Sequence, residues 1–147
     1  MTTYVQNRKA HFNFSIEDTI ETGIELYGFE VKAIKAGKGN LAGAFGIVRG
    51  GEIYIVNMNI PPYQTENTPK DYDPDRPRKL LLNKKEIAEL ADLDKRGGLT
   101  LIPTSLYSKG RRIKVALAVA KGKKLFDKRE SIKKRDTDRD IRRTLKE

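Results

Sequence analysis

Cysteine is absent from the 147 residues, and histidine occurs once, as His11. Without cysteine the chain has no disulfide, no thiol nucleophile and no thiolate zinc site, and it fits a cytoplasmic protein. A single histidine also excludes a metal site built from several histidines. Neither absence excludes an enzyme that works through carboxylates, so a metal-dependent nuclease stays open as an alternative.

Apolar residues are scarce, because the hydrophobic fraction is 37% against about 45–50% in an average globular domain. There is no apolar run that could span a membrane, no signal-peptide pattern and no basic helix with a strongly apolar face. Membrane association is therefore not expected. The length fits one domain, but this composition cannot supply a core for the whole chain, so part of it should be unfolded on its own.

Positive charge is in excess: 30 Lys and Arg face 20 Asp and Glu, which leaves a net charge of +10. The pI of about 9.8 lies above the value of ~9 that is typical of nucleic-acid-binding domains. An ordinary soluble basic protein, or a ribosomal protein with a basic extension, has a similar balance. Charge alone favours nucleic-acid binding without selecting among these classes.

Most of the N-terminal third has the pattern of β-structure. Polar and apolar residues alternate over 10–16, and the apolar residues of 29–33 are also spaced by two, as in half-buried strands. Gly28, between these patterns, predicts a bulge or a barrel corner. We therefore expect strands from Ala10 to about Gly50.

Two β-hairpins are predicted. The strand-like runs 45–49 and 52–58 are joined by Gly50-Gly51, and a type I′ turn needs positive φ at both central residues. The runs 100–107 and 112–120 follow later in the chain with a short polar connection.

One helix is predicted over Asn83–Arg96. Asn83 can cap the first turn, Glu86 three residues later completes a capping box, and Gly97 suits the end of the helix. Ahead of the helix, residues 61–77 contain five prolines and should form a long loop, a kind of segment that often carries function.

These elements predict a mainly β fold with helices. Many short antiparallel strands with one inserted helix, over residues 1–121, favour a closed or nearly closed β-barrel of the oligonucleotide-binding type. An open α+β sandwich remains the alternative.

Residues 122–147 differ in character from the rest. They contain eleven Lys and Arg and six acids, a net charge of +5, with five apolar residues. Such a segment should be disordered alone. Yet Glu130 and Lys134, like Asp138 and Arg142, are spaced for helix-stabilising ion pairs, so the segment could become helical on an anionic surface. A merely solvating tail is the alternative.

Motifs for catalysis or cofactor binding are not found. Asp71, Asp73 and Asp75 have calcium-loop spacing, but Arg76 and Leu82 occupy the positions where the loop needs Gly and Glu. No phosphate-binding loop and no G-x-S-x-G motif is present. We therefore expect no cofactor, no metal and no enzymatic activity.

Several blocks together resemble the tmRNA-binding protein family (small protein B, the SsrA-binding protein). Each is weak alone, but their order along nearly the whole chain makes the match specific. The blocks are Asn7-Arg8-Lys9-Ala10-His11, Glu21-Thr22-Gly23-Ile24-Glu25-Leu26, Gly28-Phe29-Glu30-Val31-Lys32, Gly37-Lys38-Gly39-Asn40, Ile60-Pro61-Pro62-Tyr63, Arg78-Lys79-Leu80-Leu81-Leu82-Asn83, Leu106-Tyr107, Gly122-Lys123-Lys124, Asp127-Lys128-Arg129, Ile132-Lys133 and Arg135-Asp136.

The resemblance implies a bacterial RNA-binding barrel that binds the tRNA-like domain of tmRNA. It further implies delivery of tmRNA to stalled ribosomes for trans-translation, which rescues the ribosome and tags the incomplete protein. The C-terminal tail would occupy the empty mRNA channel and become helical there. The implied partners are tmRNA, the RNA of the small ribosomal subunit and, indirectly, the elongation factor that carries alanyl-tmRNA. A monomer is expected.

The resemblance also implies two sets of site residues. For tmRNA binding they are Glu21, Leu81 and Asn83, with His11, Arg78 and Lys79 as neighbours. Each has an ordinary alternative, such as a helix cap for Asn83 or a core position for Leu81. For the ribosomal decoding centre they are Gly122, Lys123, Lys124, Phe126, Asp127, Lys128, Arg129, Lys133, Lys134 and Arg135.

Phe126 departs from the family pattern, in which Tyr or His often precedes the Asp-Lys-Arg block. Stacking on a nucleobase needs only a flat π-face, so stacking is retained with Phe while a hydrogen bond from the ring is lost.

Overall fold

Seven antiparallel strands dominate residues 2–63 and 68–122, the part of the chain that the structure, a computed structural model, describes. They are β1 (Thr2–Gln6), β2 (Phe14–Ile24), β3 (Phe45–Arg49), β4 (Glu52–Val56), β5 (Arg78–Leu81), β6 (Thr100–Lys109) and β7 (Arg112–Gly122). The hydrogen-bonded order is β1-β6-β3-β4-β5-β2-β7, and β7 pairs again with β6. Six strands therefore close into a barrel, with β1 added at β6, and the predicted mainly β fold is confirmed.

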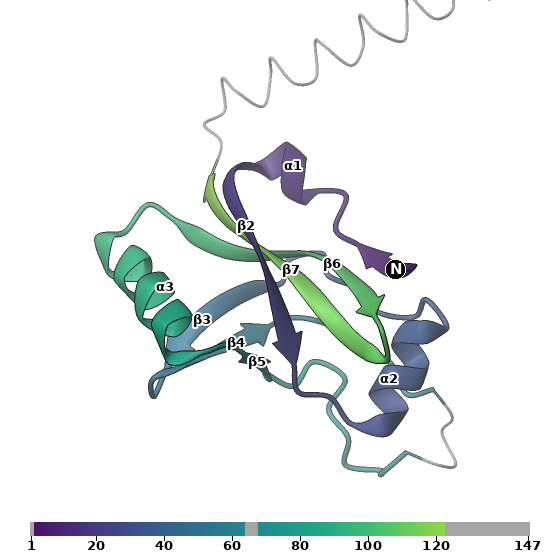
Figure 1. Cartoon of the computed structure of the whole chain (residues 1–147). Helices are drawn as coiled ribbons and strands as arrows, with labels where there is room; N and C mark the ends of the chain where they lie inside the picture. The colour runs from purple at the N-terminus through teal and green to yellow at the C-terminus, as the bar shows by residue number, and fades with distance from the viewer. Residues whose placement is uncertain (1, 64–67, 123–147) are drawn as a thin grey trace, which may run out of the picture.

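Three helices lie around the barrel in the described residues (Figure 1): α1 (Ala10–Asn13), α2 (Gly28–Lys35) and α3 (Lys84–Arg96). Ala33 and Ile34 of α2 and Leu90 of α3 are buried in the same apolar cluster as the inward side chains of the strands. Thus α2 and α3 each close part of the barrel core. No helix among the described residues has the length and apolarity needed to cross a membrane.

The locally determined elements are confirmed. Gly50 and Gly51 have φ of 61° and 75° between β3 and β4, as a type I′ turn requires. At the start of α3, Asn83 accepts a hydrogen bond from the backbone of Glu86, and the Glu86 side chain accepts one from the backbone of Asn83. Gly97 ends the helix with φ of 74°.

Two strand predictions are wrong. Residues 10–13 form α1, and 28–35 form α2, so Gly28 begins a helix and is not a barrel corner. The buried residues of α2 are Glu30, Ala33 and Ile34, which share one face of a helix. The Glu30 side chain also accepts from the backbone N–H of Tyr27 at 2.8 Å and so caps the first turn.

Glu30 joins α2 to the proline-rich loop. Arg78 is fully buried, and its Nη2 lies 2.6 Å from the Glu30 carboxylate. Arg76 forms a second ion pair with Glu30. The Tyr72 hydroxyl also donates a hydrogen bond to the Glu30 carboxylate, at 2.9 Å. Burial and the neighbouring Glu30 carboxylate raise the pKa of Tyr72 to about 12. The loop that precedes β5 is therefore fastened to the barrel by buried charge.

Candidate RNA interface

Gly23 lies at the centre of an outward-facing row of residues. It pairs with Leu81 of β5 on one side and with Lys114 of β7 on the other. A Cβ on Gly23 would lie 3.0 Å from the Leu81 Cβ, so the missing side chain lets Leu81 lie across the strand. Leu81 is 52% exposed, and the alternative that it belongs to the core is wrong.

Glu21 faces the same side of β2, because residues two apart in a strand share a face. Its carboxylate accepts a bond from Lys109 Nζ at 3.1 Å. Burial raises the pKa of Tyr107, and the charge of Glu21 and a hydrogen bond to it raise that pKa further. The opposing residue on β7 is Ala116, whose small side chain keeps this area flat.

We call Glu21, Gly23, Leu81, Tyr107, Lys109 and Lys114 the outer-face site. It combines an exposed leucine, a carboxylate acceptor and lysines, which suits contact with the bases and backbone of an RNA. The strand register is what brings these side chains together, since they come from β2, β5, β6 and β7.

Asn83 and Lys79 lie beside the outer-face site. Asn83 is exposed two residues after Leu81, and its Oδ1 caps α3, so it has a structural task whatever else it binds. Lys79 points outward from β5 and lies 3.7 Å from Glu52.

Arg78 does not lie at this surface. It faces the interior, with no exposed area, as the alternation along β5 requires. Its guanidinium donates to Glu30, to the Tyr72 hydroxyl and to the Met58 carbonyl oxygen. The prediction that Arg78 neighbours an RNA contact is therefore corrected, because all three guanidinium nitrogens donate hydrogen bonds inside the protein.

His11 is exposed on α1, at the opposite end of β2 from Glu21. Phe14, just after α1, pairs with Gly122 at the end of β7. From Phe14 to Glu21 the strand rises roughly 23 Å. The structure therefore does not bring His11 together with the outer-face site.

The predicted tail site lies almost wholly outside the described residues. Gly122 is the last residue of β7, one residue beyond the predicted domain end. The other predicted tail residues are not described: Lys123, Lys124, Phe126, Asp127, Lys128, Arg129, Lys133, Lys134 and Arg135.

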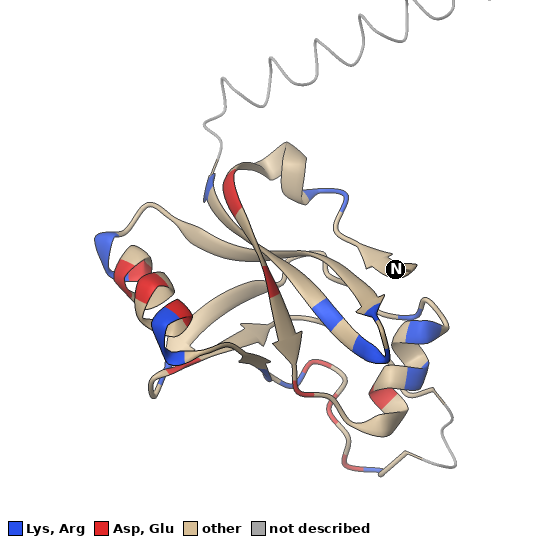
Figure 2. Ribbon diagram, in the orientation of Figure 1, with Lys and Arg blue, Asp and Glu red and all other residues tan. Residues whose placement is uncertain are grey.

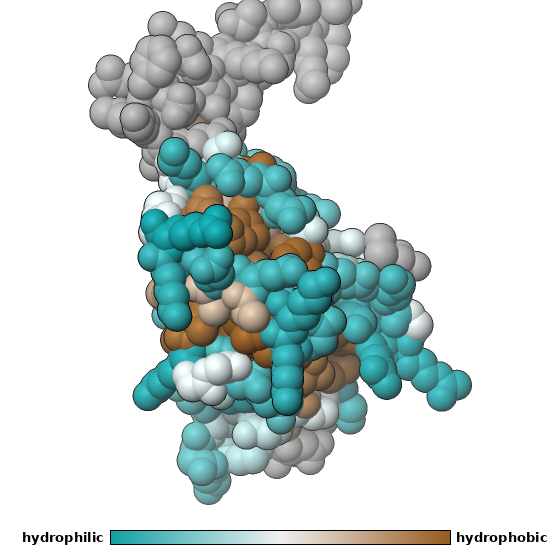
Figure 3. All heavy atoms as spheres, turned by 60° about the vertical axis from the view of Figure 1, so that its left-hand side comes forward, coloured by the Kyte–Doolittle hydropathy of each residue, from teal (hydrophilic) through white to brown (hydrophobic). Residues whose placement is uncertain are grey.

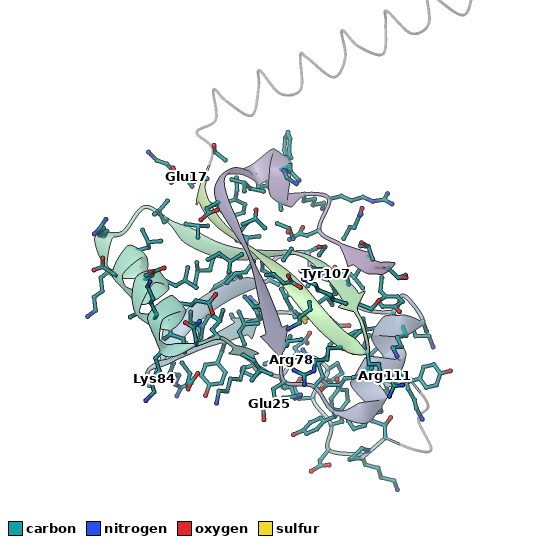
Figure 4. The ribbon with its side chains drawn as sticks, viewed as in Figure 1. Glu17, Glu25, Arg78, Lys84, Tyr107 and Arg111 are labelled. Atoms are coloured by element: carbon teal, nitrogen blue, oxygen red, sulfur yellow. The ribbon has the colours of Figure 1, made fainter. Side chains whose placement is uncertain are left out.

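Sequence reasoning missed the cations of the β6–β7 hairpin. Figure 2 shows Lys and Arg along the hairpin end of β7 and on α2, and Figure 4 places Arg111 at the hairpin beside α2. Arg111, Arg112 and Lys114 border a hollow of about 450 Å³ next to Leu81. The signal was the alternation of 112–120, which sets Lys114 opposite the buried Ile113 and Val115.

Seen from the side of α3, hydrophobic residues are visible between hydrophilic ones across the middle of the molecule (Figure 3). Large exposed apolar side chains among the described residues are Tyr27, Tyr63 and Leu81. Of these, only Leu81 belongs to the outer-face site.

A family model described as SmpB protein matches residues 4–147. The chain belongs to the SmpB family. The SsrA-binding protein of Caldicellulosiruptor saccharolyticus is 53% identical over 141 residues, which cover 96% of this chain and 89% of the relative. That of Bradyrhizobium sp. (strain BTAi1) is 52% identical over 147 residues, with coverage of 99% and 93%.

A solved structure agrees with this family. A chain from the structure described as "tmRNA-SmpB: a journey to the center of the bacterial ribosome" superposes with a TM-score of 0.70. It is 40% identical, and the match covers 86% of this chain and 92% of the solved one. The barrel described above is thus shared with the SmpB family.

Proposed function

We propose that the protein binds tmRNA and delivers it to stalled ribosomes for trans-translation, as an adaptor and not as an enzyme. The relatives are named SsrA-binding proteins, and the similar solved chain comes from a tmRNA-SmpB structure. The observation that carries the proposal is the convergence of Glu21 and Leu81 on one exposed face around Gly23.

The outer-face site would grip the tRNA-like domain by mixed contacts. Leu81 offers apolar area for a base or ribose, and the Glu21 carboxylate can accept from base amino groups. Lys109 and Lys114, together with Lys79 beside the site, would neutralise phosphates and release counterions.

The tail, residues 122–147, would act on the ribosome. Its eleven Lys and Arg suit ribosomal RNA, and its acid-before-base pairs suit a helix. We propose that it occupies the empty mRNA channel, next to small-subunit RNA. The elongation factor carrying alanyl-tmRNA would be an indirect partner. The protein would work as a monomer in the cytoplasm.

A truncation tests whether the two surfaces are separate. The shortened chain should end at Gly122, because β7 pairs with β2 up to that residue. We expect its Kd for tmRNA to stay within about threefold of the full chain, whereas tagging of incomplete proteins is abolished. As a comparison, the full-length Leu81→Asp variant should lose both tmRNA binding and tagging. Equal loss of binding and tagging on truncation would contradict two separate surfaces.

The adaptor role has its own test. Purified protein incubated with RNA and magnesium should leave the RNA intact, and magnesium-dependent cleavage would favour a nuclease instead. The tmRNA affinity should also fall with salt, with a logarithmic slope of at least ~2 if three lysines neutralise phosphates. A flat salt profile would remove the electrostatic part of the proposal.

A further inference from the structure

A hollow lined by aromatic rings lies between the start of α2 and the loop that precedes β5. Its volume is about 430 Å³, and its lining includes Tyr27, Phe29 and Tyr72. The ring centroids of Phe29 and Tyr72 are 4.8 Å apart in an edge-to-face arrangement, and those of Tyr27 and Phe29 are 5.5 Å apart. Tyr27 is 53% exposed. We call these three connected rings the aromatic wall.

Contacts with the charged groups around Glu30 hold the aromatic wall in place. The Tyr72 hydroxyl donates to Glu30 and accepts a hydrogen bond from Arg78, each at 2.9 Å. The guanidinium carbon of Arg76 lies 4.1 Å from the centre of the Tyr27 ring, and Arg76 is itself paired with Glu30. The hollow is therefore formed before any ligand arrives, which lowers the cost of binding.

The rim of the hollow carries two exposed carboxylates, Asp71 and Asp73. Within residues 2–63 and 68–122, neither of them forms an ion pair. The backbone N–H of Asp75 donates to Asp73 Oδ1 at 2.9 Å and so orients that carboxylate. The cation in the lining, Arg76, is already engaged by Glu30. The hollow thus presents negative charge beside aromatic rings, on a protein whose net charge is +10.

This combination favours a flat cation. The face of an aromatic ring attracts a cation within about 6 Å of its centre. A guanidinium group stacks on such rings and also donates two parallel hydrogen bonds to a carboxylate. Arg76 over Tyr27 shows that this surface accepts a guanidinium. Phosphates would instead be repelled by the two carboxylates, so a nucleic acid is disfavoured here.

We propose that this hollow binds an arginine side chain from a basic segment of a protein partner. The guanidinium group would lie against the aromatic wall and donate to Asp71 and Asp73. The inference goes beyond the proposed function, because it assigns a protein contact to the α2 side of the molecule. Among the described residues, none lines both this hollow and the one beside Leu81.

A separate protein is a better occupant than the basic tail of the same chain. The last residue of β7, Gly122, pairs with Phe14 just after α1. The first residue of β7, Arg112, lies in the hairpin beside α2, at the other end of the strand (Figure 1). The strand rises roughly 33 Å between these two ends. Residues 123–147 therefore follow from the end of the barrel that is remote from the hollow.

The probe is the capped pentapeptide acetyl-Gly-Ser-Arg-Ser-Gly-amide, titrated into the full-length protein at low salt. The readout is the NMR shift of the ring protons of Tyr27, Phe29 and Tyr72. We expect these signals to move and to saturate with a Kd in the millimolar range, since one side chain is bound. The same peptide with citrulline in place of arginine keeps the shape and loses the charge. It should bind at least about 5-fold more weakly.

The carboxylates are tested by the double variant Asp71→Asn/Asp73→Asn. Its affinity for the arginine peptide should fall about 3- to 10-fold, while the new asparagine can still accept from the Asp75 backbone. The matched control is Glu89→Gln/Asp94→Asn, which removes the same charge from exposed positions on α3. The control should bind the peptide as the wild type does.

The aromatic wall is tested by Tyr27→Leu, which should weaken peptide binding about 2- to 5-fold. Its control is Tyr63→Leu, because Tyr63 is another exposed tyrosine that does not line the hollow. This control should leave the peptide affinity unchanged. Since Asp71 and Asp73 are exposed, the carboxylate variant stays informative even where Tyr27→Leu folds poorly.

Four results would overturn the inference: ring signals that the arginine peptide does not move, equal affinity for the arginine and citrulline peptides, equal losses in the two double carboxylate variants, or a tighter fit for spermidine or for a pentauridylate RNA than for the peptide. The tmRNA affinity of Asp71→Asn/Asp73→Asn is measured in parallel and should not fall. Its loss would assign the hollow to RNA. If the wild-type chain fails to bind tmRNA, the proposed function fails, whereas the peptide titration, which contains no RNA, still reports on the hollow.

Discussion

The carboxylate of Glu30 and the guanidinium of Arg78 lie 2.6 Å apart, and neither side chain has exposed surface. Two charges removed from water in this way need each other and further hydrogen bonds. Arg78 obtains them from the carbonyl oxygens of Met58 and Pro74. Removing Glu30 would leave the Arg78 guanidinium buried without a carboxylate, and removing Arg78 would leave the buried Glu30 carboxylate with Arg76 as its remaining ion-pair partner.

Arg78→Met should therefore lower the free energy of unfolding by about 3–5 kcal/mol, measured by urea denaturation at neutral pH. Lys79→Ala is the matched control, because Lys79 is the next residue of β5, points outward and lies 3.7 Å from Glu52. Its effect should stay below ~1 kcal/mol. A stable Arg78→Met protein that had lost tmRNA binding would mean that Arg78 contacts RNA after all.

The pH dependence of stability should report the same ion pair. Burial acts to raise the pKa of Glu30, but hydrogen bonds from Arg76 and the Tyr27 backbone, together with Arg78, hold that pKa below 4.5. The unfolded chain then binds the proton more tightly, so stabilisation by Glu30 is complete above pH 4.5 and is lost as pH falls through the lower, folded pKa.

An NMR titration of the Glu30 carboxyl carbon should thus give a midpoint below 4.5. In Arg76→Gln, which removes one of the two arginines at a partly exposed position, the midpoint should move up. A wild-type midpoint at or above 4.5 would mean that the hydrogen bonds and the arginines do not outweigh the effect of burial on the pKa of Glu30.

Glu21 can be tested through its neighbour Tyr107. Burial and then Glu21 raise the pKa of Tyr107 above 10.0, so Glu21→Gln should lower it, as read from the NMR shift of the Tyr107 ring carbon that bears the hydroxyl. Loss of the exposed ion pair between Glu21 and Lys109 should lower the free energy of unfolding by less than ~1 kcal/mol. We expect the tmRNA affinity to fall about tenfold.

Glu17→Gln is the control for Glu21, since Glu17 lies on the same strand but away from Tyr107 (Figure 4). It should leave both the Tyr107 titration and the tmRNA affinity as in the wild type. A Glu21→Gln protein with the full tmRNA affinity would limit Glu21 to an ion-pairing role.

Elements fixed by neighbouring residues could be predicted from the sequence. The Gly50-Gly51 turn and the Asn83–Glu86 capping box depend on contacts within a few residues. Helix α2 could not be predicted in this way, because Phe29 and Val31 alternate like a strand. The face that is buried includes Glu30, a charge that is tolerated only because arginines 46 and 48 residues away meet it.

The candidate site was also predicted only in part, because some of its contacts depend on the pairing of distant strands. The family resemblance indicated Glu21 and Leu81, and the structure adds that they converge around Gly23. Tyr107 and Lys109 were missed, because their place beside Glu21 depends on the register of β6, β7 and β2. The resemblance places Arg78 beside the RNA contacts, whereas the alternation of β5 turns its side chain into the protein.

Gly23 should be required for the placement of Leu81. In Gly23→Ala the new Cβ would lie 3.0 Å from the Leu81 Cβ, so Leu81 must shift by a few tenths of an ångström while the strands stay paired. We expect the tmRNA affinity to fall about 3- to 10-fold, which corresponds to ~0.6–1.4 kcal/mol. The measurement is a binding titration, with the folded fraction taken from thermal unfolding.

Gly28→Ala provides the matched substitution. A Cβ at Gly28 meets no atom within 4 Å, and Gly28 begins α2, where alanine should stabilise by up to ~1 kcal/mol. Its tmRNA affinity should be unchanged. If Gly23→Ala instead bound tmRNA as tightly as Gly28→Ala while a structure of the variant showed Leu81 displaced, the exposed leucine would not be a contact for RNA, and the lysines and Glu21 would have to account for binding alone.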